Sequence, residues 1–122
     1  MGGTEWGKVM ADKRKYPSDP LDFIRDCVRN RRIYWTYHVN MRLKDRFLDR
    51  GMILESADAY EIIEVYLEDK YLPSYLVYAR HRGVAFHVLF AADVEERNVR
   101  VVTSYYPDPV LWDPALKTRR KS

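Results

Sequence analysis

The chain has 122 residues, of which 47% are hydrophobic and 32% are charged. This length suits one domain with a real core, and this composition excludes a chain that is disordered along most of its length. The net charge of +3 permits binding to nucleic acid without requiring it. The single cysteine, Cys27, excludes an internal disulfide and a cysteine-based zinc site, and fits a reducing compartment.

The sequence has no apolar run near the roughly 18 to 20 residues that a membrane span requires, and no signal-peptide core follows the first methionine. We therefore expect a cytoplasmic protein without a membrane partner. Residues 1–19 lack a sustained hydrophobic period and end in turn-forming residues, which predicts a flexible arm. Residues 20–122 are expected to form a single domain with a basic C-terminal tail.

Two helices are predicted near the start of this domain. The first begins with Asp19 as N-cap and Pro20 at the first helical position, and apolar residues recur after them at helical spacing. The second covers YHVNMRLKDRF, residues 37–47, with Thr36 as its cap and Gly51 ending it. Its apolar row is Val39, Leu43 and Phe47. Its polar row, about 100° away, is His38, Arg42 and Arg46. The polar row is either a solvated face or a site of anion contact.

Four strand-like runs follow the helices: EIIEVYL, SYLVYAR, VAFHVLFAA and NVRVVTSYY. The loops between them are short enough for an antiparallel meander. A short helix is expected over SADAYEII before the sheet, and RRIYWTY is either a strand or an extended link. The order of elements predicts an α+β fold in which N-terminal helices pack on an antiparallel sheet of four or more strands.

His87 lies in the middle of an apolar run, VAFHVLFA. A histidine there needs a partner for its ring, so it is either a hydrogen-bonded core residue or a catalytic one. Tyr78 and Arg80 share one face of the preceding strand, and Ser104 and Tyr106 share one face of the last strand. If these faces coincide, the sheet presents His, Arg and Tyr together, a combination that binds phosphate and stacks on bases.

The end of the chain is basic, because Lys117, Arg119 and Arg120 follow Trp112 closely. If this tail folds back over the sheet, it is suited to contact phosphates and bases, whereas a frayed tail does nothing specific. The sequence contains no glycine-rich phosphate loop, no H-E-x-x-H motif and no cysteine cluster, so we expect neither a metal nor a cofactor.

Several motifs recur together in one family. They are YHVNMRLKDR, where the family has a His followed by Arg at the fourth and eighth positions, EIIEVYLEDKYLPSYLVYAR, GVAFHVLFAAD, and VVTSYYPDPVLW up to the closing RR. From about residue 33 to 120 the chain thus resembles a bacterial and archaeal family catalogued as domain of unknown function 4258. The family positions that match are His38, Arg42, Arg46, His87 and Tyr106. Phe47 and Leu48 depart from the Arg-Gly-Ile that the family usually has after the helix, and residues 1–20 are extra.

The family is similar to the RelE, ParE and BrnT group of small toxins. This resemblance implies their fold and the role of a toxin in a type II toxin-antitoxin pair. The toxin would cleave mRNA, free or on the ribosome, without a metal, and its antitoxin partner would often carry a zinc-finger domain. The alternative is a non-catalytic RNA- or protein-binding module of the same fold, because a fold alone does not establish an activity.

Metal-free RNA cleavage needs a base for the 2′-OH proton, cations for the charge on the phosphorane, and an acid for the leaving 5′-oxygen. The hypothesis makes His87 or His38 the acid or base and three arginines the phosphate contacts. The candidate catalytic residues are His87, His38, Arg42, Arg46, Arg80 and Tyr106. The candidate RNA-binding residues are Tyr78, Trp112, Lys117, Arg119 and Arg120.

Overall fold

The fold is known from a computed structural model that describes residues 15–121. Most of the predicted N-terminal arm, residues 1–14, lies outside the described residues. The elements in chain order are α2 (Pro20–Arg29), β1 (Ile33–Trp35), α3 (Tyr37–Asp45), α4 (Arg50–Glu55), the 3-10 helix η1 (Ala57–Ala59), β2 (Glu61–Tyr66), β3 (Ser74–His81), β4 (Val84–Asp93) and β5 (Asn98–Tyr105). The order of helices and strands confirms the predicted α+β class.

The strands form one five-stranded sheet in the order β1-β5-β4-β3-β2. The four predicted strands are present and pair antiparallel as a meander. We predicted a sheet of four strands and left open whether it has more. The sheet has five, because β1 lies at one edge and pairs parallel to β5. Three residues are too few for an alternating pattern to separate a strand from an extended link, which is why the sequence left this segment open.

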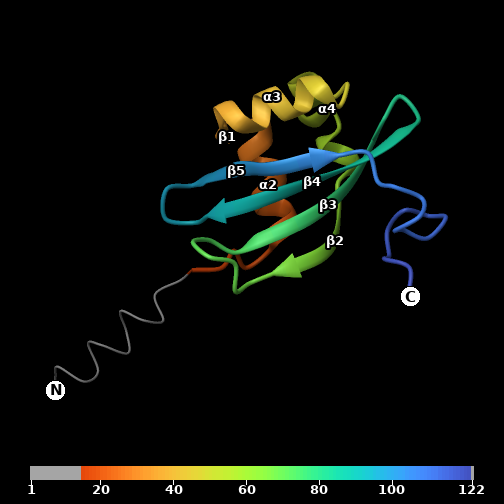
Figure 1. The fold of residues 1–122 in the computed structure, drawn as a ribbon. Coiled ribbons are helices and arrows are strands. Elements are labelled where there is room, and N and C mark those ends of the chain that lie inside the picture. Colours follow the sequence, from red (N-terminus) through yellow and green to blue (C-terminus); the bar gives the residue numbers. More distant parts are fainter. Residues whose placement is uncertain (1–14, 122) are drawn as a thin grey trace, which may run out of the picture.

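Helix α2 covers one face of the sheet and lies behind the strands in Figure 1. It begins as predicted, since Asp19 Oδ1 accepts a hydrogen bond from the amide of Asp22 at 3.1 Å and Pro20 occupies the first position. Its buried residues pack against the side chains of β3, β4 and β5 that point to the same face. This core includes Ile24, Val28, Tyr75, Val77, Phe86, Val88, Phe90, Val99 and Val101.

The two neighbouring strands β1 and β5 differ in length, and α3 occupies the space that this difference leaves. Their register runs from Ile33 beside Val99 to Trp35 beside Val101, whereas β5 continues to Tyr105. The chain leaves β1 at Trp35 and turns at once into α3, which packs along β5 and is drawn above it in Figure 1. Helix α3 therefore borders the part of β5 that extends past the end of β1.

The end of α3 differs from the prediction. The helix stops at Asp45, and the amides of Phe47 and Leu48 donate to the carbonyls of Lys44 and Leu43, which is the hydrogen-bond pattern of a Schellman motif. Phe47 has a φ of 59° and is 89% exposed, while Leu48 is buried. The predicted apolar row of Val39, Leu43 and Phe47 is thus wrong at its last member, because the helix ends before Phe47 and Leu48 takes its place in the core.

Gly51 does not end α3 but lies inside α4. This helix starts one residue after Asp49, whose Oδ1 accepts a hydrogen bond from the amide of Met52 at 2.9 Å. The short helix expected over SADAYEII begins earlier in the chain, at Arg50, and only the 3-10 helix η1 lies within that segment. The capping carboxylate at Asp49, a typical N-cap, decides where α4 begins.

We expect Phe47→Gly to raise the free energy of unfolding by about 1 kcal/mol, because the left-handed conformation costs an L-residue roughly 1–2 kcal/mol and Gly loses more backbone entropy. The ring is exposed, so little packing is lost. Urea denaturation of both proteins measures the difference. Leu48→Ala is the neighbouring control and should lower stability by about 2–5 kcal/mol, since Leu48 is buried. A loss for Phe47→Gly as large as that for Leu48→Ala would contradict this account.

Candidate functional site

A polar groove of about 220 Å³ lies between α3 and the part of β5 that β1 does not reach. Its lining residues are His38, Val39 and Arg42 from the helix and Val102, Thr103 and Ser104 from the strand. His38 and Arg42 are exposed and lie one helical turn apart, so their side chains project from the same side of α3. An imidazole, a guanidinium and a threonine hydroxyl therefore converge on one open groove.

Arg46, the third member of the polar row, connects α3 to β5. Its Nη1 donates to the carbonyl oxygen of Ser104 at 2.7 Å and to Oγ1 of Thr103 at 3.2 Å. The side chain is half-buried, and hydrogen bonds from a charged donor contribute about 1.5–3 kcal/mol to stability. Arg46 therefore fixes the strand wall of the groove relative to the helix, and the polar row is not merely a solvated face.

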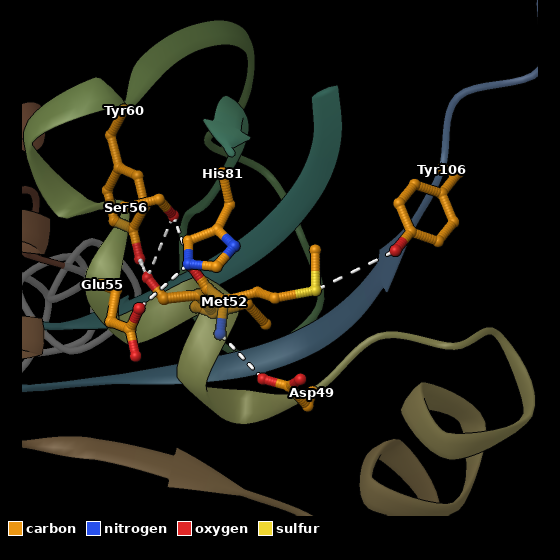
Figure 2. A network of polar contacts seen from close by, with 8 residues as sticks. Asp49, Met52, Glu55, Ser56, Tyr60, His81 and Tyr106 are labelled. Carbon is orange, nitrogen blue, oxygen red and sulfur yellow. Dashed lines mark hydrogen bonds and ion pairs between the residues drawn. The ribbon is translucent and has the colours of Figure 1, made fainter. Parts of the chain in front are cut away.

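Tyr106 lies at the junction between α3 and α4 (Figure 2). Its hydroxyl donates to the carbonyl oxygen of Phe47 at 3.0 Å and lies 3.9 Å from the sulfur of Met52. In the same view His81 Nε2 contacts Glu55 Oε1 on α4 at 2.9 Å. These contacts attach α4 and the turn after α3 to the sheet, so Tyr106 lies beside the turn that follows Arg46.

His87 is fully buried on the face of the sheet opposite α2. Its Nε2 is 2.7 Å from the carbonyl oxygen of Leu116, and its Nδ1 is 3.3 Å from the hydroxyl of Tyr105. Because a carbonyl only accepts, Nε2 carries the proton and Nδ1 accepts from Tyr105. Trp112 packs against the imidazole edge-on, with ring centroids 4.5 Å apart. Burial lowers the pKa of His87, although the Leu116 carbonyl and Glu64 oppose this effect.

The C-terminal segment, residues 107–121, folds back over the outer face of the sheet, which is the face opposite α2. Lys117 Nζ lies 3.0 Å from Glu61 Oε2 and 4.9 Å from the ring centroid of Tyr78. Arg119 Nε donates to Glu64 Oε2 at 2.8 Å. Two of the cations predicted to bind RNA are thus paired with carboxylates of β2, which offset their charge.

The remaining candidates from the sequence also have partners near this segment. Arg120 Nε donates to the carbonyl oxygen of Pro109 at 2.8 Å. Arg80 donates to the Tyr78 hydroxyl at 3.1 Å and to the carbonyl oxygen of Gly83 at 2.9 Å. The structure therefore brings His38, Arg42 and Arg46 together at the groove, and places His87, Tyr78, Arg80, Trp112, Lys117, Arg119 and Arg120 in or beside the covered part of the outer face.

The alternation predicted for the last strand differs in the structure. Strict alternation put Ser104 and Tyr106 on one face and left open whether that face also carries His87, but a register shift in the pairing of β4 and β5 between Leu89 and Phe90 changes the alternation. As a result Tyr105 contacts His87, and Ser104 is buried. The sequence NVRVVTSYY carries no glycine or proline that would have marked such a bulge.

The described part of the chain, residues 15–121, has no group of three or more His, Cys, Asp or Glu side chains arranged to hold a metal ion. Within the same residues, none of the helices combines the length and the apolar composition needed to cross a membrane.

Fold and groove together define a small α+β domain in which an exposed His and Arg face the part of β5 that extends past the end of β1. The chain belongs to the family described as Domain of unknown function (DUF4258), whose model matches residues 35–106. This confirms the resemblance to that family seen in the sequence, although the match ends at Tyr106 and does not extend to about residue 120. The match contains the groove and His87 and leaves out α2 and the C-terminal segment.

Comparison with curated proteins and with solved structures found no match to the chain. The similarity to RelE, ParE and BrnT toxins stays a prediction.

His87 is expected to make stability fall in acid. Because its pKa is lowered in the folded protein, the unfolded chain takes up a proton as the pH falls below about 6.5 and the folded protein does not. The stabilisation from neutral His87 is therefore fully present above pH 6.5. As the pH falls from 6.5 to the lower pKa of the folded protein, the free energy of unfolding decreases by at most about 1.4 kcal/mol per pH unit. Urea unfolding gives the free energies of unfolding of the wild type and His87→Gln, and the difference between them should become smaller as the pH falls from 7.5 to 5. A difference that stays constant over this range would contradict a lowered pKa of His87.

Proposed function

We propose that the protein is the toxin of a type II toxin-antitoxin pair and cleaves mRNA without a metal at the groove between α3 and β5. The observation that carries the proposal is the convergence of His38, Arg42 and Thr103 on one open groove. Arginine binds phosphate oxygens, and histidine is the side chain best suited to proton transfer near neutral pH. Both groups are exposed, as contact with an RNA strand requires.

In this proposal Arg42 binds the phosphate and His38 takes the proton from the ribose 2′-hydroxyl. The 2′-oxygen bonds to phosphorus, the bond to the 5′-oxygen breaks, and the leaving oxygen takes a proton from water. Arg46 is a positioning residue, because its guanidinium is bonded to Thr103 and Ser104 and holds the strand wall in place. Of the two histidines considered from the sequence, the groove thus favours His38.

A non-catalytic RNA- or protein-binding module is the second candidate. The observation that favours it is the burial of His87, whose two ring nitrogens are engaged by Leu116 and Tyr105. The groove then has one accessible histidine and no second imidazole to act as the acid. Both candidates predict contact with an anionic partner, so only a measurement of cleavage separates them.

The test is to induce the wild type in a host that lacks the antitoxin, and to measure growth and mRNA integrity. The wild type should arrest growth and fragment mRNA, and His38→Ala should lower the cleavage rate of the purified protein roughly 100-fold or more. Arg42→Ala should weaken RNA binding, most clearly at low salt. Lys44→Ala is the matched control, because Lys44 is an exposed cation on the same helix that does not line the groove.

The outcomes distinguish the two candidates. RNA binding that survives in His38→Ala while cleavage is lost supports a catalytic role for this residue. Normal growth and intact mRNA with the wild type contradict the toxin, and RNA binding without cleavage then supports the non-catalytic module.

A further inference from the structure

A second, larger cavity of about 440 Å³ continues from the groove along the outer face of the sheet. The loop between β2 and β3 forms one wall with Tyr71, and the strands form the floor with Ser74 and Ala91. The start of α3 closes the other side with Thr36. Volumes of about 300–1,000 Å³ are typical of small-molecule sites, so this cavity is large enough to hold a ligand group, whereas the groove beside it is smaller.

The cavity and the groove form one continuous surface, because His38, Val39 and Val102 line both of them. His38, which the proposed function places at the cleaved phosphate, therefore also lies at one end of the cavity. A polymer held at the phosphate by Arg42 would carry its neighbouring unit into this cavity.

The lining of the cavity suits a flat ring with polar edges. Val102 and Ala91 provide apolar surface, and the hydroxyls of Thr36 and Ser74 can donate or accept hydrogen bonds at an edge. Single-stranded RNA is recognised in this way, with unstacked bases placed on aromatic side chains and bonded along their edges.

Tyr71 provides an aromatic surface at the rim of the cavity. The residue is 77% exposed, and the Lys70 ammonium lies 5.2 Å from its ring centroid. Arg100 on the floor is held by Asp93, whose carboxylate oxygen lies 2.9 Å from its guanidinium. The cavity thus has an exposed aromatic ring at its rim, with one ammonium beside that ring and one guanidinium paired with a carboxylate. An exposed aromatic ring is the surface on which a base stacks.

We infer that this cavity binds the RNA base next to the phosphate in the groove, stacks it on Tyr71 and sets the sequence preference of the protein. The inference rests on the proposed function, since it assigns the same RNA strand to both parts of the surface. Stacking of a base on an aromatic side chain changes affinity by roughly 5- to 150-fold. Loss of the stacking surface should therefore lower the affinity for a nucleotide by a factor within this range, and loss of the polar edges should remove the preference between bases.

Ala91→Leu tests the inference by filling the cavity. Ala91 pairs with Ser74 and with Arg100 in the sheet, so its side chain lies on the cavity floor. The matched control is Ala85→Leu, which adds the same side chain to the same face at the other end of β4, beside Arg80. Tyr71→Ala is a second variant at an exposed loop position, and it keeps the test valid if Ala91→Leu does not fold.

The first measurement is an NMR titration of the wild type with AMP, GMP, CMP and UMP, which does not depend on cleavage. At least one nucleotide should shift the signals of Tyr71, Ser74 and Ala91 saturably, and Ala91→Leu or Tyr71→Ala should weaken its binding at least about 5-fold while Ala85→Leu does not. If no nucleotide shifts these signals, or if the cavity variants bind as the wild type does, the inference is overturned.

The second measurement is the sequence at the ends of fragments cut from a random RNA pool. Ala91→Leu and Tyr71→Ala should lose the base preference beside the cut, and Ala85→Leu should keep it. Cleavage with an unchanged preference in both cavity variants would overturn the inference and leave the proposed function standing. Absence of cleavage in the wild type would contradict the proposed function, and the nucleotide titration would then decide the inference.

Discussion

The groove between α3 and β5 depends on one constraint, which is that the pairing of β1 with β5 stops at Trp35. Strand β1 accompanies β5 only from Val99 to Val101, so the rest of β5 lies beside a helix rather than a strand. A helix cannot continue the hydrogen-bond ladder of a sheet, and Arg46 satisfies the Ser104 carbonyl with its guanidinium instead. The groove exists because side chains from a helix and the edge of a strand meet there without a third element between them.

The outer face of the sheet has two parts with different chemistry. Near His87 it is covered by residues 107–121, and the cations of that segment face Glu61 and Glu64 of the edge strand β2. Toward α3 and the β2–β3 loop it is hollowed and bordered by exposed cations. A mildly basic chain thus pairs its cations with β2 carboxylates at one end of the face and exposes the Arg42 guanidinium at the other, which total charge alone does not reveal.

The sequence predicted those features that depend on local chemistry. Asp19 and Thr36 cap their helices because a side-chain oxygen near the first turn is enough. The side chains of β3 and β4 alternate between the two faces because a strand has a period of two residues. Phe47 was assigned wrongly because the Schellman turn is set by where Leu43 and Leu48 pack, and no glycine marks it. The bulge in β5 and the cover over His87 depend on contacts between segments distant in the chain, so neither has a local signal. His38, Arg42 and Arg46 were found because they fall in one predicted helix, although Arg46 is the C-cap residue that follows α3.

The cover over His87 makes the environment of one buried side chain depend on the end of the chain. Trp112 packs against the imidazole and the Leu116 carbonyl accepts a hydrogen bond from it, and both residues lie after the last strand. The core under α2 is formed by other residues on the opposite face of the sheet. A chain without residues 107–121 would therefore expose the imidazole to water on one face and keep the side chains that pack under α2 on the other.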